Sequence, residues 1–252
     1  MKPAKGRAPK NNTGRLSKIM TTQTTDYADM TLDELRLALA PAIASSAIFD
    51  GWNETALIAA AEMDGADPDI AKLAFPKRSA GGGIGSNQAM DMIEAWITTI
   101  DLAMEAEWPQ ERLATLKIRE RIRALVAFRL EAVADLEEAV RRALAVMAMP
   151  QNARRSLQLG WRSADIMWRL AGDTATDYNH YSKRTILAGI YSATLAVFVN
   201  DDSEDHAKTY EFLDRRIDGV MRFEKFKHQL TNRNVEMPSL SRFLGRLRYP
   251  SR

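Results

Sequence analysis

The chain of 252 residues is long enough to bury a substantial core, and its 46% hydrophobic and 27% charged residues exclude wholesale disorder. The absence of cysteine excludes disulfides, thiolate catalysis and cysteine-ligated zinc or iron–sulfur sites. The net charge of +2 combines basic ends with an acidic middle, residues 21–221, which holds 21 basic and 31 acidic residues and is a poor surface for nucleic acid.

Residues 1–30 predict a disordered basic tail. The first twenty carry six basic residues and no acid, but they lack the apolar core of a secretory signal peptide. A transit peptide is also disfavoured, because its amphipathic helix would be interrupted by Pro3, Gly6, Pro9 and Gly14. No apolar run approaches the length of about eighteen residues that crosses a bilayer, so we expect any membrane contact to be peripheral.

Residues 31–78 predict a three-helix unit. Thr31 followed by Glu34 is the pattern of a helix-opening capping box, and an apolar stripe at helical spacing comprises Leu32, Leu35, Leu39 and Ile43. Residues 53–63 and 67–75 predict two short helices joined by a turn. A helix followed by two short helices is the layout of a helix-turn-helix unit, which in other proteins binds DNA.

The candidate recognition helix of this unit is acidic. Asp67 and Asp69 lie at the end that would approach DNA phosphates, whereas a DNA-reading helix needs cations there. Lys77 and Arg78 reduce this repulsion without reversing it. We therefore expect a degenerate helix-turn-helix scaffold that binds no nucleic acid.

Residues 86–230 predict a larger helical domain, reached through a flexible glycine- and serine-rich loop over 79–86. Its first apolar stripe comprises Met90, Ile93, Ile97, Ile100 and Met104. Pro109 is then predicted to begin a helix that contains Leu116, Ile122 and Leu125. A further continuous stripe comprises Leu130, Val133, Leu136, Val140, Leu144 and Met147.

Three more helices complete this domain. Residues 151–171 place four apolar side chains in register, namely Leu157, Trp161, Ala164 and Trp168. Residues 177–199 predict the next helix, and a last stripe comprises Tyr210, Leu213, Ile217 and Val220. No segment shows sustained strict alternation, so the sequence predicts an all-α protein of nine or ten helices.

Residues 238–249 differ from the rest of the chain. One helical face carries Leu240, Phe243, Leu244 and Leu247, and the cations Arg242 and Arg246 lie mostly off that face, with no acid in the segment. This pattern is typical of an amphipathic helix that lies in a membrane interface. The alternative is a C-terminal helix docked on the acidic body of the protein itself.

The sequence does not indicate a metal, cofactor or catalytic site. With three histidines and no Glu-x-x-His motif, the ligands of a carboxylate-bridged di-iron bundle are missing. Asp177 and His180 share a helix face, but one such pair is more often a surface contact than a metal site. The glycine run over 81–85 lacks both the lysine of a phosphate loop and the spacing of a dinucleotide fingerprint.

Two sequence blocks carry a resemblance to a known family. The first is MAMPQN at 147–152, followed by Ser156 and Leu157. The second is WRLAGDTATDYNHYSKR at 168–184, followed by IYSAT at 190–194. Together these blocks resemble the ubiquinone biosynthesis accessory protein family Coq-nine, most strongly over residues 145–216.

The resemblance implies a TetR-regulator-like helical bundle that pairs as a homodimer and has no catalytic role of its own. It also implies that the larger domain holds a lipid, an isoprenoid quinone intermediate, and presents it to the di-iron demethoxyubiquinone hydroxylase. The C-terminal amphipathic helix would contact the bilayer. Such a protein would be cytoplasmic and peripheral on the inner membrane, or lie in the mitochondrial matrix of a eukaryote.

Carried over by position, the hydroxylase-binding surface comprises Asp177, Tyr178, Asn179, His180, Tyr181 and Arg184. This sequence departs from the animal members of the family, which have a tryptophan in place of His180. Tryptophan is a strong interface anchor, so the contact here would be weaker, differently shaped or compensated on the partner. A structural interpretation stands beside this one, in which Gly172 ends one helix and Thr176 or Asp177 caps the next.

A lipid pocket is expected among helices that are apolar on more than one side. The candidate lining residues on the two helices that flank the motif are Trp161, Met167, Trp168, Ile190, Tyr191 and Leu195. For each of them an ordinary core position is an equally good interpretation. The rival function is that of a TetR-like transcriptional regulator, and an enzyme acting directly on the lipid is disfavoured by the missing motifs.

Overall fold

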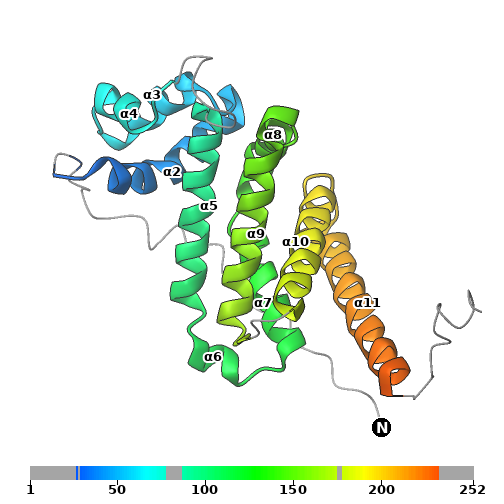
Figure 1. Ribbon diagram of the computed structural model, residues 1–252. Coiled ribbons are helices and arrows are strands. Elements are labelled where there is room, and N and C mark those ends of the chain that lie inside the picture. The colour runs from blue at the N-terminus through cyan, green and yellow to red at the C-terminus, as the bar shows by residue number, and fades with distance from the viewer. Residues whose placement is uncertain (1–26, 28, 78–86, 175–177, 233–252) are drawn as a thin grey trace, which may run out of the picture.

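The computed structural model describes residues 27, 29–77, 87–174 and 178–232, and every regular element within them is helical (Figure 1). The α-helices are α2 (Leu32–Asp50), α3 (Glu54–Asp64), α4 (Pro68–Ala74), α5 (Gln88–Glu107), α6 (Gln110–Ala114), α7 (Ile118–Glu131), α8 (Glu137–Met147), α9 (Ala153–Leu170), α10 (Tyr178–Phe198) and α11 (Ala207–Asn232). The 3-10 helices η1 (Ala134–Leu136), η2 (Pro150–Asn152) and η3 (Glu204–His206) precede α8, α9 and α11. The all-α fold predicted from the sequence is confirmed.

Helices α2, α3 and α4 pack together at one end of the molecule (Figure 1). The capping box that opens α2 forms as predicted, with Thr31 N donating to Glu34 Oε2 at 2.9 Å and Glu34 N donating to Thr31 Oγ1 at 3.3 Å. Helix α3 ends at Gly65, whose φ of +78° lies in the left-handed region that favours glycine.

The three-helix unit is joined to the rest of the protein by one continuous apolar core. Helix α2 packs against both α5 and α8. Between α2 and α3, the buried Trp52 donates from Nε1 to the carbonyl of Ala139 in α8 at 3.0 Å, and its ring lies 5.3 Å from that of Trp96 in α5. The unit is therefore anchored to the body by a buried aromatic pair as well as by apolar packing.

The body is arranged around α5, which contacts α7, α8 and α9. Its buried residues are mainly aliphatic side chains and methionines, including Met92, Ile93, Met104, Leu125, Leu130 and Met167. One charged pair, Asp101 and Arg129, is buried within this core and links α5 to α7. The guanidinium of Arg129 also lies 4.9 Å from the ring centre of Tyr191, which brings α10 into the same contact.

Helices α10 and α11 pack against each other, and α10 also covers α9 (Figure 1). The turn between α10 and α11 is organised by Asp201, which accepts hydrogen bonds from Thr209 N at 2.8 Å, Thr209 Oγ1 at 2.6 Å and Ser203 N at 3.0 Å. Burial favours the neutral acid, but the hydrogen bonds from Ser203 and Thr209 outweigh it and lower the pKa of Asp201 far below its ordinary value.

Two predicted helices are each divided in the structure. The segment after Pro109 forms α6 and then α7, because the chain turns at Thr115 and resumes its helix after Lys117. The stripe predicted as continuous over 130–147 is likewise interrupted between α7 and α8 by a turn and η1. Both sides of each break are apolar, so the stripe continues in the sequence although the helix axis changes direction.

The buried face of α9 also differs from the predicted one. Leu157 is 76% exposed, whereas Leu159, Ser163, Ile166 and Met167 are buried. Of the four side chains predicted in register, Ala164 is therefore buried, Trp161 and Trp168 are half-buried, and Leu157 is exposed. Helix α9 carries apolar side chains on both of its faces, and the neighbouring helices α5, α7 and α10 determine which face is covered.

Three predictions fall on parts of the chain outside the described residues. These are the basic tail over most of 1–30, the loop over 79–86 and the amphipathic helix over 238–249. Among the helices that the structure does describe, none is both long enough and apolar enough to cross a membrane.

Candidate binding surfaces around helix α9

The turn between α9 and α10 contains the second of the two sequence blocks. Helix α9 ends at Leu170, and Gly172 follows with a φ of +87°. A β-carbon at Gly172 would lie 3.2 Å from Nη1 of Arg121, which itself donates to the carbonyl of Ala171 at 2.8 Å. Both the backbone conformation and the close approach of Arg121 therefore favour glycine at this position.

A cluster of four charged side chains fixes the geometry of this turn. Arg184, which is 2% exposed, donates to Asp165 Oδ1 at 2.5 Å and to Asp173 Oδ2 at 3.1 Å. Lys183 completes the cluster by donating to Asp173 Oδ1 at 2.7 Å. Burial favours the neutral acid at Asp173, but the hydrogen bonds from Lys183 and Arg184 outweigh it and lower the pKa of Asp173.

Arg184 thus acts as a positioning residue in this structure. Its Nη1 also donates to the carbonyl of His180 at 3.1 Å, so the first turn of α10 is tied to the end of α9. Trp168 adds a second tie by donating from Nε1 to the carbonyl of Lys183 at 3.0 Å. The partner-binding role predicted for Arg184 would therefore be indirect, through the placement of the residues before it.

The remaining predicted partner residues are only partly described. Asp177 and the side chains of Tyr178 and Asn179 lie outside the described part of the chain. His180 is partly buried and its ring contacts that of Tyr181 edge-on at 5.2 Å, whereas Tyr181 is 61% exposed. The partner role of these residues stays a prediction.

Tyr181 belongs to an apolar ridge on α9 and α10, in which Tyr181 and Leu157 are exposed and Trp161 is half-buried. The ring of Trp161 lies 6.0 Å from that of Tyr181, and the exposed Leu157 lies one helical turn before Trp161. Single exposed apolar residues are normal on a protein surface, but contiguous ones are typical of an interaction site. We define this ridge by Leu157, Trp161 and Tyr181.

The structure does not gather the six predicted lipid-lining residues around one cavity within its described part. Met167 is fully buried in the core, Trp168 packs over the α9–α10 turn, and Trp161 is half-buried in the ridge beside Tyr181. Tyr191 and Leu195 are partly buried against the core. Their lipid-binding role stays a prediction.

The sixth residue, Ile190, lines a groove between α10 and α11. The groove has a volume of about 410 Å³ and is lined by Ile186, Gly189, Ile190, Ala193, Arg215, Arg216, Gly219 and Val220. Small and aliphatic residues form most of this lining, and two arginines stand beside them. A groove of this kind can accept an apolar chain or the side of another helix.

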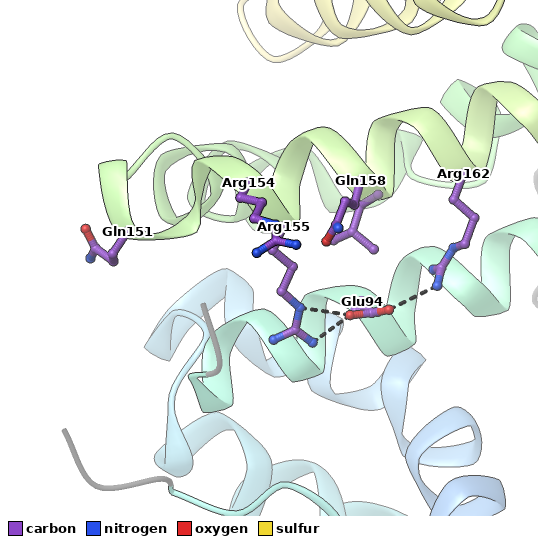
Figure 2. Close-up of a pocket in the computed structure, with 7 residues that line it drawn as sticks. Glu94, Gln151, Arg154, Arg155, Gln158 and Arg162 are labelled. Atoms are coloured by element: carbon purple, nitrogen blue, oxygen red, sulfur yellow. Dashed lines mark hydrogen bonds and ion pairs between the residues drawn. The ribbon is translucent and has the colours of Figure 1, made fainter. Parts of the chain in front are cut away.

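A second groove, which the sequence analysis missed, lies between α5 and the N-terminal half of α9 (Figure 2). It has a volume of about 280 Å³ and a polar lining of Glu94, Gln151, Arg154, Arg155, Gln158 and Arg162, with Leu159 as its apolar member. A sequence signal existed, because residues 151, 155, 158 and 162 recur at helical spacing as long polar side chains.

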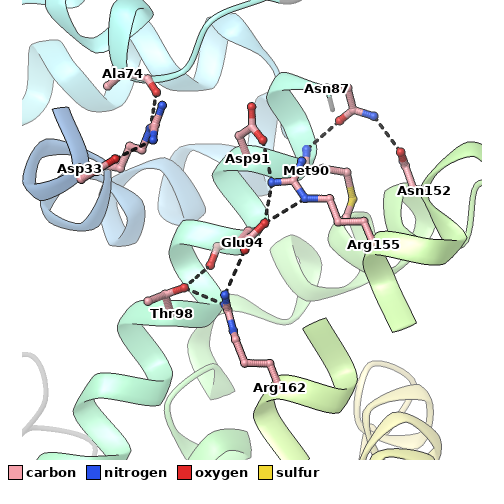
Figure 3. A network of polar contacts seen from close by, with 11 residues as sticks. Asp33, Ala74, Asn87, Met90, Asp91, Glu94, Thr98, Asn152, Arg155 and Arg162 are labelled. Carbon is pink, nitrogen blue, oxygen red and sulfur yellow. Dashed lines mark hydrogen bonds and ion pairs between the residues drawn. The ribbon is translucent and has the colours of Figure 1, made fainter. Parts of the chain in front are cut away.

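Glu94 organises this second groove (Figure 3). Its carboxylate accepts from Arg155 Nη2 at 2.6 Å and from Arg162 Nη1 at 3.0 Å. The start of α9 is tied to the start of α5 by Asn152, which is fully buried and accepts from Asn87 Nδ2 at 2.9 Å. Asn152 is the last residue of the first sequence block. Its burial and its hydrogen bond to Asn87 give this residue a structural role.

The described residues contain no group of three or more His, Asp or Glu side chains placed to hold a metal ion. The fold and its surfaces define a TetR-like helical protein with grooves and an exposed apolar ridge. This fold class is supported by a TetR transcriptional regulator from Nitrosomonas europaea, which is 20% identical. The two structures match with a TM-score of 0.57 over 73% of this chain and 96% of that chain.

The sequence comparisons name a family. The COQ9 family model matches residues 153–224, from the start of α9 into α11. The protein named "Ubiquinone biosynthesis protein COQ9, mitochondrial" from Rattus norvegicus is 32% identical over 174 residues, which cover 68% of this chain and 54% of the rat protein. The protein of that name from Homo sapiens is 30% identical over 174 residues, covering 68% of this chain and 52% of the human protein.

The resemblance predicted from the two sequence blocks is therefore confirmed. Residues 153–224 belong to the COQ9 family, and the fold that carries them is TetR-like. The chain spans about half the length of the rat and human relatives that it matches. A Drosophila melanogaster relative of the same name extends the similarity to 81% of this chain, at 27% identity.

Proposed function

We propose that the protein acts in ubiquinone biosynthesis as a non-catalytic accessory protein that binds an isoprenoid quinone intermediate and presents it to the demethoxyubiquinone hydroxylase. The observation that carries this proposal is the COQ9 match over 153–224. That match coincides with helices α9, α10 and α11, which form the exposed ridge and the groove between α10 and α11.

The groove between α10 and α11 could cover part of an isoprenoid tail outside the bilayer, which is the physical task of such an accessory protein. Withdrawing an isoprenoid tail from a bilayer costs about 0.8 kcal/mol for each methylene that becomes exposed to water. Aliphatic side chains such as Ile186, Ile190 and Val220 would offset part of that cost by covering the tail. This task requires binding surfaces and no reactive group.

The exposed ridge is the proposed contact for the hydroxylase. Tyr181 and Trp161 present large, rigid side chains, the type that supplies most of the binding energy in protein interfaces. The cluster around Arg184 fixes the start of α10, so the ridge is held in place before a partner arrives. We also propose a homodimer that is peripheral on a membrane, either at the bacterial inner membrane or in the mitochondrial matrix.

The first test is extraction of the gently purified protein with solvent, followed by mass spectrometry for isoprenoid quinones. We expect a polyprenyl quinone or its precursor at near one molecule per chain. Ile190→Asn should reduce this occupancy several-fold, whereas Ser192→Asn, on an exposed position of the same helix, should not. Empty protein, or equal loss in both variants, would argue against a lipid site in this groove.

The second test addresses the partner. Tyr181→Ala should weaken binding of the hydroxylase from the same organism by about tenfold or more, while the exposed control Thr185→Ala should leave it unchanged. The rival function, a transcriptional regulator, would show instead as saturable, sequence-selective duplex binding that weakens with salt. We expect no such binding, because Asp67 and Asp69 lie at the start of α4.

A further inference from the structure

The groove between α5 and α9 has the lining of an anion site (Figure 2). Three guanidinium groups and two primary amides from α9 and η2 surround it, contributed by Arg154, Arg155, Arg162, Gln151 and Gln158. These groups are hydrogen-bond donors, and arginine matches the geometry of phosphate oxygens particularly well. An apolar lipid tail offers these donors no hydrogen-bond acceptor, so this groove suits a different ligand from the one proposed for α10 and α11.

Two of the three arginines are held in place before any ligand binds (Figure 3). Arg155 pairs with Asp91 Oδ1 and Glu94 Oε2, each at 2.6 Å from Nη2. Arg162 pairs with Glu94 and also donates from Nη2 to Thr98 Oγ1 at 2.8 Å. These contacts limit the rotation of both side chains, which lowers the entropic cost of binding.

The charges of the groove do not balance. Asp91 and Glu94 supply two negative charges against the three arginines. Arg154 is exposed and makes no ion pair with any residue that the structure describes. The groove therefore keeps a positive charge at Arg154, within reach of a bound anion.

The start of α9 adds to this positive potential. The helices α2 to α8 carry an acidic residue in the first turn, which complements the positive end of the helix dipole, whereas α9, like α10 and α11, carries none there. Its first turn contains Arg154 and Arg155 instead. An anion in the groove would stabilise this end of the helix.

We propose that this groove binds a phosphate-type anion, either free or as part of a lipid headgroup. Arg154 makes the direct charged contact, Gln151 and Gln158 donate further hydrogen bonds, and Arg155 and Arg162 supply the surrounding positive potential. The site is independent of the quinone groove, and its failure would leave that proposal unchanged.

The test compares two neutralising substitutions at opposite ends of α9. Arg154→Gln removes the proposed contact, and Arg169→Gln removes an exposed arginine whose partner, Asp165, keeps Arg184. The full chain is titrated with pyrophosphate by calorimetry, with chloride at matched ionic strength as the reference. We expect Arg154→Gln to weaken pyrophosphate binding by about tenfold or more, and Arg169→Gln to stay within roughly twofold of the wild type.

A second arm separates the two sources of the anion. The fraction of protein that floats with phosphatidylcholine vesicles is measured with and without phosphatidylglycerol in the vesicles. The basic ends of the chain are the same in every variant, so their contribution to vesicle binding cancels in the comparison. If Arg154→Gln reduces binding to the phosphatidylglycerol vesicles but not to pyrophosphate, the anion is a lipid headgroup. If Arg154→Gln reduces pyrophosphate binding in the calorimetric arm, the anion is a free phosphate. Equal behaviour of the two variants in both arms, or no binding in either, overturns the proposal.

Discussion

The two ends of α9 use the same residue type for opposite purposes. At the C-terminal end, Arg184 of α10 is buried and satisfied by Asp165 and Asp173, so its charge serves the fold. At the N-terminal end, Arg154 is exposed. The nearby carboxylates of Asp91 and Glu94 pair with Arg155 and Arg162, so the charge of Arg154 is not compensated. The surroundings of an arginine, more than its presence in a motif, determine whether its charge serves the fold or stays available at the surface.

The largest expected effect comes from removing the buried arginine. Arg184→Met keeps most of the side-chain length but leaves two carboxylates without their shared partner. Breaking a buried ion pair typically costs about 3–5 kcal/mol. We expect about 3 kcal/mol, since Lys183 still pairs with Asp173 and Arg169 with Asp165. Urea denaturation measures this loss in the free energy of unfolding.

The matched control is Arg154→Met at the other end of α9. Because Arg154 is exposed, its replacement should change the free energy of unfolding by no more than about 0.5 kcal/mol. Similar losses in the two variants would remove the distinction between the ends of the helix.

The second effect is a dependence on pH at the same cluster. Asp173→Asn keeps the size of the side chain and removes its charge, and we expect a loss of about 1–2 kcal/mol at pH 7. The folded protein lowers the pKa of Asp173, so this contribution is complete above the unfolded pKa of about 3.9 and is lost as the pH falls through the lower, folded pKa. The difference between the variant and the wild type should therefore shrink as the pH falls below about 4.

Denaturation curves at several pH values between 7 and 3 measure this difference directly. Asp201 also has a lowered pKa, but it is present in both proteins and its contribution cancels in the comparison. A constant difference across the whole range would show that the charge of Asp173 does not stabilise the turn.

Local features of the fold could be predicted from the sequence, and long-range ones could not. The capping box at Thr31 and the turn at Gly65 involve residues close together in the chain, so their patterns were sufficient. The break between α7 and α8 escaped prediction, because both helices bury apolar residues and the stripe therefore runs on without interruption.

The candidate sites show the same limit. The block over 168–184 identified the family, but the burial of Arg184 depends on Asp165, which is 19 residues away, and could not be read from the motif. The groove at the start of α9 depends on Glu94 and Arg155, which are 61 residues apart. The polar stripe on α9 is visible in the sequence, but the sequence does not show that α5 lies opposite it.

A smaller effect is expected at the glycine of the α9–α10 turn. Gly172→Ala places a β-carbon at a φ of +87° and 3.2 Å from Nη1 of Arg121. The left-handed conformation alone costs about 1–2 kcal/mol for a residue with a β-carbon, so we expect a destabilisation of that size by thermal or urea unfolding. An unchanged free energy of unfolding would mean that the turn relaxes to another conformation. Such a change would move Tyr181, and a measurement of hydroxylase binding would then detect it.

The smallest effect has the opposite sign and lies in the middle of α9. Gly160 has an ordinary helical conformation, and no atom lies within 4 Å of the position that a β-carbon would occupy. Gly160→Ala should therefore stabilise the protein by about 0.5–1 kcal/mol, because alanine loses less backbone entropy on folding. Paired with Gly172→Ala, it tests the same substitution in two backbone conformations, helical at Gly160 and left-handed at Gly172, twelve residues apart in the sequence. If Gly172→Ala lowers the free energy of unfolding and Gly160→Ala raises it, then the turn at the end of α9 is rigid and the space beside Gly160 is open in solution. If Gly160→Ala lowers it instead, then a ligand, a second copy or another part of the chain packs closely against this face of α9.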